Sequence, residues 1–67
     1  MKNSDIEISV VYKNNVVEDF IIDEKELDRT IKQAKDESRS DFHIGEKQFI
    51  KEDVAVVATS DYSIQFL

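Results

Sequence analysis

Residues 23–39, DEKELDRTIKQAKDESR, form the one segment with a clear helical pattern, and apparent strands lie on both sides of it. Asp23 is suited to cap the N-terminus, because its carboxylate accepts hydrogen bonds from the free N–H groups of the first turn. Leu27, Ile31 and Ala34 recur at helical spacing and form a narrow apolar stripe. The segment therefore predicts one helix over its length, which lies on a sheet through this stripe.

Basic side chains gather on the opposite face of this predicted helix. They are Lys25, Arg29, Lys32 and Arg39, with Asp36 among them. A basic stripe is either a contact surface for an acidic partner or a solvated face held by ion pairs one turn apart. Such a pair contributes about 0.2–0.5 kcal/mol. We interpret the stripe as a solvated face and keep the contact surface as the alternative.

The segments 6–12 and 16–22 alternate apolar and polar residues, which is the period of half-buried strands. A three-residue loop at 13–15 aligns the apolar residues of both strands, whereas a two-residue turn does not. We therefore predict a hairpin with Asn15 in the left-handed conformation. Glu18 is the mismatch in this register, because it falls on the apolar face. The predicted pairs are Ile6–Ile22, Ile8–Phe20 and Tyr12–Val16.

Four short strands are expected after the helix. They comprise residues 42–44 and 48–50 around a turn at Gly45, the apolar run 54–59, and a last strand after a Ser60-Asp61 turn. The alternative to the last two is one long bent strand from Val54 to the end. The last hairpin sets Val57 against Ile64 and Ala55 against Phe66, with Val54 and Leu67 on the outer face. The order ββαββββ predicts an α+β fold, an antiparallel sheet or small open barrel of about six short strands with one central helix. We expect a single domain over residues 1–67, with a flexible tail at 1–5.

Length and composition limit how this chain is stabilised. A chain of 67 residues buries only about 60% of its unfolded surface, and this one has no cysteine for a disulfide. We therefore expect a homodimer. No segment approaches the roughly 20 apolar residues that span a bilayer, and the first residues lack the apolar stretch of a signal peptide. We expect a cytoplasmic protein without a membrane segment.

The net charge of −6 lies outside the predicted helix. The segment 24–39 carries five acids and five bases, and the rest of the chain carries ten acids and four bases. Direct binding of nucleic acid is disfavoured, because that attraction requires neutralisation of phosphates. The acidity either imitates nucleic acid in the basic groove of a partner or serves solubility.

No residue pattern predicts a catalytic, cofactor or metal site. His43, with Asp41 nearby, is the single candidate general base. The acidic run 36–41 begins like a calcium loop, but its sixth position is Asp41 and its twelfth is Lys47. These two positions require glycine and glutamate, so the pattern fails.

The remaining hypothesis is a small acidic, non-enzymatic protein-interaction module, a regulator or inhibitor of another macromolecule. Nucleic-acid-binding proteins are one class of partner under this hypothesis. The module would bind through its acidic surface or its apolar C-terminal edge strand. The candidate interface residues are Glu18, Asp19, Glu52, Asp53, Tyr62, Ile64, Phe66 and Leu67. The alternatives are a structural homo-oligomeric subunit and, less favoured, a small enzyme or metal-binding domain that uses His43.

Overall fold

The computed structural model describes residues 5–61 and 63–66 of the chain. Six strands, one α-helix and a short 3₁₀ turn follow one another in the predicted order ββαββββ, which confirms the α+β class. The elements are β1 (Ile6–Tyr12), β2 (Val17–Ile22), α1 (Glu24–Lys35), β3 (Asp41–Ile44), β4 (Lys47–Ile50), η1 (Lys51–Asp53), β5 (Val54–Ala58) and β6 (Ser63–Gln65). Most of the tail predicted at 1–5 lies outside the described residues.

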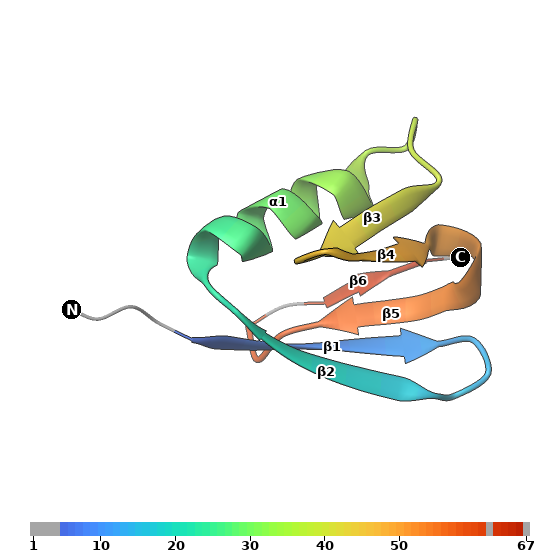
Figure 1. The fold of residues 1–67 in the computed structure, drawn as a ribbon. Coiled ribbons are helices and arrows are strands. Elements are labelled where there is room, and N and C mark those ends of the chain that lie inside the picture. The colour runs from blue at the N-terminus through green and yellow to red at the C-terminus, as the bar shows by residue number, and fades with distance from the viewer. Residues whose placement is uncertain (1–4, 62, 67) are drawn as a thin grey trace.

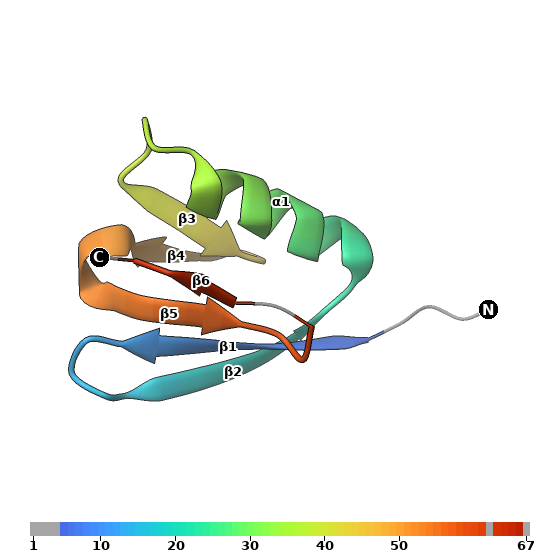
Figure 2. The same ribbon diagram turned by 180° about the vertical axis from the view of Figure 1, so that it is seen from behind.

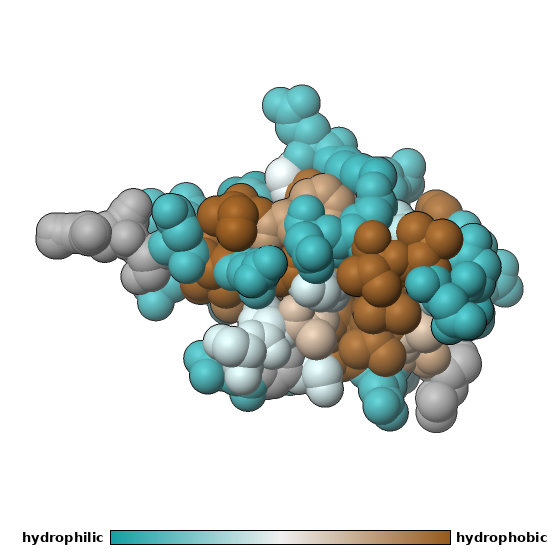
Figure 3. Space-filling view, turned by 90° about the horizontal axis from the view of Figure 1, so that it is seen from below, coloured by the Kyte–Doolittle hydropathy of each residue, from teal (hydrophilic) through white to brown (hydrophobic). Residues whose placement is uncertain are grey.

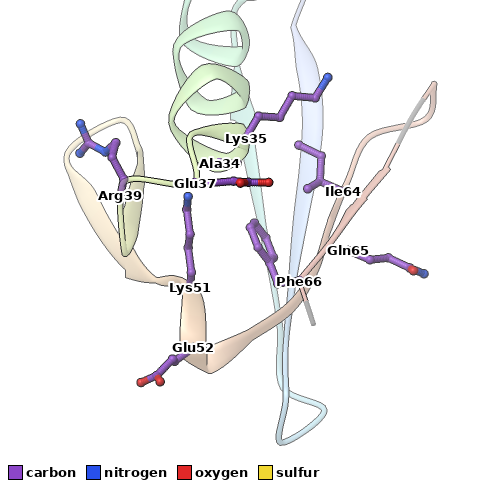
Figure 4. A pocket seen from close by; sticks show the side chains of 9 residues that line it. All are labelled: Ala34, Lys35, Glu37, Arg39, Lys51, Glu52, Ile64, Gln65 and Phe66. Atoms are coloured by element: carbon purple, nitrogen blue, oxygen red, sulfur yellow. The ribbon is translucent and has the colours of Figure 1, made fainter.

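The strands divide into a four-stranded antiparallel sheet, in the order β2-β1-β5-β6, and a separate two-stranded sheet of β3 and β4. The β3–β4 hairpin lies between the larger sheet and α1 in both views (Figures 1 and 2). The helix makes most of its contacts with β3. The helix also meets the larger sheet directly, since its Ala34 is buried in the core and lies beside Ile64 and Phe66 (Figure 4).

The predicted register of the first hairpin is confirmed. Ile6 pairs with Ile22 and Ile8 pairs with Phe20, and the Tyr12 N–H donates to the Val16 carbonyl over 2.8 Å. Asn15 has φ of 73°, the left-handed conformation that a three-residue loop requires.

The second hairpin of the larger sheet is also confirmed, except for its first residue. Val57 pairs with Ile64, and the Phe66 N–H donates to the Ala55 carbonyl. The prediction that Val54 lies on the outer face was wrong, because its side chain is fully buried. The register of β5 against β1 shifts between Val11 and Tyr12, and this irregularity turns Val54 to the inner face.

The helix is shorter than the predicted segment 23–39 and ends at Lys35. Its start is as predicted, since the Asp23 side chain accepts from the Glu26 N–H over 2.8 Å. At the other end, the Asp36 carboxylate accepts from the Ser38 N–H and hydroxyl, and this local turn competes with another helical turn. The Lys51 ammonium donates to the Asp36 carbonyl, which satisfies a carbonyl at the end of the helix.

The core is enclosed by the helix, the β3–β4 hairpin and the inner face of the larger sheet. Its buried apolar residues are Ile8, Val10, Ala34, Phe42, Ile44, Phe49, Val54 and Val57. Phe42 and Phe49 stack with ring centroids 5.2 Å apart. Phe49 also contacts Phe20 of β2, and Phe42 stacks on Phe66, which follows β6. Four aromatic rings therefore cross the inner face from one edge strand to the other.

Polar side chains of α1 complete the backbone hydrogen bonds of β3 and its turn. The Thr30 hydroxyl, which is fully buried, donates to the His43 carbonyl over 2.7 Å. The Gln33 side-chain oxygen accepts from the His43 N–H, and the Glu26 carboxylate accepts from the Gly45 N–H. Thr30 is therefore buried against β3, although it is not one of the three apolar residues of the predicted stripe.

We expect Phe49→Ala to lower the free energy of unfolding by about 3–5 kcal/mol, because truncation of a buried aromatic ring leaves a cavity. Ile50→Ala is the matched control, since this neighbouring side chain on β4 is exposed. Its cost should stay below about 1 kcal/mol. Urea unfolding of the wild type and both variants measures the difference, and equal costs would contradict the core described above.

Candidate functional site

The six predicted interface residues that the structure describes do not form one surface. Glu18 and Asp19 are neighbours on β2, so their side chains point to opposite faces of the sheet. Asp19 lies on the outer face opposite Ser9, whose hydroxyl donates to its carboxylate. Tyr62 and Leu67 lie outside the described residues.

Glu18 belongs to a polar cluster that links the two hairpins. Its carboxylate accepts hydrogen bonds from the Tyr12 hydroxyl and from the Lys47 ammonium, which lies 2.8 Å from both oxygens. Lys47 also lies over the rings of Phe49 and Phe20, at 5.5 and 5.9 Å from their centroids. Tyr12 and Lys47 therefore supply the hydrogen-bond donors that allow the Glu18 carboxylate to lie on the apolar face.

The cluster shifts the ionisation of both its acidic members. Hydrogen bonds from Lys47 and Tyr12 hold the pKa of the Glu18 carboxyl below its ordinary value of 4.5. Burial raises the pKa of Tyr12 to about 12, with further contributions from the hydrogen bond to Glu18 and from the charges of Glu18 and Asp53. These contacts give Glu18 a structural role.

Glu52 and Asp53 lie in η1 and have exposed side chains. The Asp53 carbonyl accepts from the Lys13 N–H over 2.9 Å, so η1 is held beside the β1–β2 loop. Glu52 lines two hollows, one beside this loop and one beside β6. These two acids therefore remain accessible, at the end of the sheet where the β1–β2 loop lies.

Ile64 and Phe66 point toward the core and not into solvent. Both are partly buried against it. They form the apolar floor of a groove of about 520 Å³ beside β6 (Figure 4). Charged side chains from the helix end and from η1 surround this floor; they are Lys35, Glu37, Arg39, Lys51 and Glu52. Arg39 and Lys51 are engaged within the chain, by the Asp41 carboxylate and the Asp36 carbonyl.

The outer face of the larger sheet is the surface that the sequence analysis missed. Val17 and Ile21 of β2 are 54% and 63% exposed. Val17, Val11 and Val56 are paired in one row across three strands. Seen from below, apolar side chains gather in groups separated by polar ones (Figure 3). The sequence of β2 contains apolar residues on both of its faces, with Val17 and Ile21 on one and Phe20 and Ile22 on the other. This pattern indicates an exposed apolar row on one face of the strand.

Glu7 and Asp19 are the charged residues on this outer face. Both are exposed, and Glu7 lies opposite Ile21. Within the four described strands, the positions that share this face include no lysine or arginine. We call this surface, which comprises Glu7, Ser9, Val11, Val17, Asp19, Ile21, Val56, Ala58, Ser63 and Gln65, the outer face. It combines exposed apolar side chains with two acids, and Asp19 lies between Val17 and Ile21.

His43 is not arranged as a general base with Asp41. Its ring Nδ1 lies 3.3 Å from the Gln33 side-chain oxygen. The Asp41 carboxylate instead accepts from Arg39 and Gln48. The described residues contain no group of three or more metal-ligating side chains, and no helix among them is long and apolar enough to cross a membrane.

We expect Glu18→Gln to reduce the loss of stability in acid. Because the pKa of Glu18 is lowered in the folded state, its ionised form stabilises the fold at pH values above 4.5, and this contribution is lost as the pH falls through the folded pKa. Urea midpoints across this range should show a smaller fall for the variant than for the wild type. The same Glu18→Gln change in a Lys47→Met background should add little, and a full additive effect would contradict the cluster.

Comparison with known proteins identifies no relative of this chain. No protein-family model matches it, and no curated protein and no solved structure gives a match.

Proposed function

We propose that this chain is a small, acidic, non-enzymatic protein-interaction module that regulates or inhibits another protein by binding it. The observation that carries the proposal is the outer face, where Val17 and Ile21 are largely exposed beside Glu7 and Asp19. Exposed apolar side chains with charged side chains beside them are typical of a protein-binding surface.

The charge of this face indicates the class of partner. With a net charge of −6 and no basic residue at its described strand positions, the outer face favours a partner with an apolar surface bordered by lysine or arginine. Nucleic-acid-binding proteins are one class with such surfaces, and direct binding of nucleic acid is disfavoured. The absence of cysteine is compatible with a reducing compartment, and we place the protein in the cytoplasm.

Two of the interface residues predicted from the sequence, Phe66 and Glu18, are unsuited to test this proposal. Truncation before Phe66 removes a ring that stacks on Phe42, and reversal of Glu18 breaks the contact with Lys47. Both changes would act on folding as well as on binding. Asp19 and Glu7 are better positions, because they are exposed on the outer face.

We expect the double variant Glu7→Lys and Asp19→Lys to lose a partner that the wild type retains in its native lysate. Affinity capture and quantitative mass spectrometry should show at least a roughly tenfold loss, because favourable charge pairs become repulsive. Raised salt should also weaken capture by the wild type.

The control is Glu24→Lys with Glu46→Lys, which changes the net charge equally at exposed positions away from the outer face. It should retain the partner. Equal capture by both double variants would contradict the proposal, and equal loss would indicate that net charge alone determines binding.

A structural homo-oligomer, with a homodimer as its simplest form, is the second candidate function. It is favoured by the large apolar residues that are exposed within residues 5–61 and 63–66, which are Val16, Val17, Ile21 and Ile50. Concentration-dependent thermal unfolding, with capture of the chain's own copies alone, would replace the first candidate by this one.

A further inference from the structure

β2 is an edge strand with a regular set of outward backbone groups. It lies at one end of the strand order and pairs with β1 on its other side. Tyr12 and Val16 are a hydrogen-bonded pair, and such pairs alternate with non-hydrogen-bonded ones along an antiparallel ladder. The backbone groups of Glu18, Phe20 and Ile22 therefore bond to β1. The backbone N–H and C=O groups of Val17, Asp19 and Ile21 therefore point away from the sheet.

The same three residues place their side chains on the outer face. Val17 and Ile21 are more than half exposed, and Asp19 lies between them. A strand added at this edge would pair with the backbone N–H and C=O groups of these three residues. It would also lie beside their side chains, which are apolar, acidic and apolar in turn. Edge strands with such groups are templates for pairing with another chain.

The other strand edges are shorter or closed. On β3, the His43 N–H and C=O are bonded to Gln33 and Thr30 of the helix. The other edge of the larger sheet, β6, has three residues, against six for β2. Within the described residues, β2 is therefore the longer of the two edges of the larger sheet.

A second copy of the chain fits this edge poorly. A symmetric antiparallel pairing centred on Asp19 sets two aspartates opposite one another, and one centred on Glu18 sets two glutamates opposite one another. A pairing centred on Phe20 sets Asp19 against Ile21. Each register opposes like charges or places an acid against an apolar side chain, so the edge favours a different chain.

We propose that β2 accepts, by antiparallel strand addition, a segment of another protein that reads apolar–x–Lys/Arg–x–apolar. The basic residue lies opposite Asp19, and the apolar residues lie opposite Val17 and Ile21. Main-chain hydrogen bonds supply affinity and the charge pair selects the segment. This inference rests on the proposed function, since it names the class of segment that binds at one border of the outer face.

The test uses the full chain and two fluorescent nine-residue peptides that differ at one position. One has Lys at its centre and Val two residues to each side, and the other has Glu at the centre. Fluorescence polarisation should show about tenfold tighter binding of the Lys peptide to the wild type. Asp19→Lys should reverse this preference, and Glu46→Lys, an equal charge change on the exposed β3–β4 turn, should retain it.

Backbone pairing is tested by N-methylation of the Lys peptide. Methylation of the central Lys amide removes a hydrogen bond to Asp19 and should weaken binding at least tenfold. Methylation of the next residue, whose N–H points away from β2, is the matched control and should have little effect. Binding should also slow amide hydrogen exchange at Val17, Asp19 and Ile21.

Absence of binding by the Lys peptide, equal affinity for both peptides, or equal effects of the two methylations would overturn strand addition at β2. The proposed function would survive any of these results if the Glu7 and Asp19 double variant still lost its captured partner. Retention of that partner by the double variant would overturn the proposed function itself.

Discussion

The stacking of Phe42 on Phe49 is the contact on which the rest of the fold depends. These two rings belong to the small hairpin, and they meet Phe20 and Phe66 at opposite edges of the larger sheet. The helix in turn contacts mainly β3. A chain of this length buries a smaller share of its surface than a longer chain, and aromatic side chains bury the largest area per residue. A line of aromatic rings across the inner face therefore supplies much of the buried apolar area.

The β3 edge and the β2 edge differ in their hydrogen-bond partners. The first is bonded to the helix, and the second is the edge at which we propose binding. The helix closes the β3 edge with Thr30 and Gln33, whose side chains replace the backbone partners of a further strand. β2 has no such cover from the helix, and its outward row is interrupted by one acid, Asp19. A single charge discourages self-pairing while it admits a strand of opposite charge.

Neighbouring acids on β2 have unrelated roles because of the two-residue period of a strand. Glu18 points inward, where Tyr12 and Lys47 bond its carboxylate and lower its pKa. Asp19 points outward beside Val17 and Ile21. The net charge of the chain therefore has a structural part and an exposed part, and the proposed interaction depends on the exposed part.

The sequence by itself determined the local features: the cap at Asp23, the left-handed Asn15 and both hairpin registers of the larger sheet. Each depends on residues close in the chain, whose spacing reports the geometry directly. The tertiary structure decided the division into two sheets, the inward turn of Val54 and the burial of Thr30. It also decided that Ile64 and Phe66 face the core and that the exposed apolar residues lie on β2. These features depend on contacts between distant segments, and periodicity gives the faces of a strand without saying which face another layer covers.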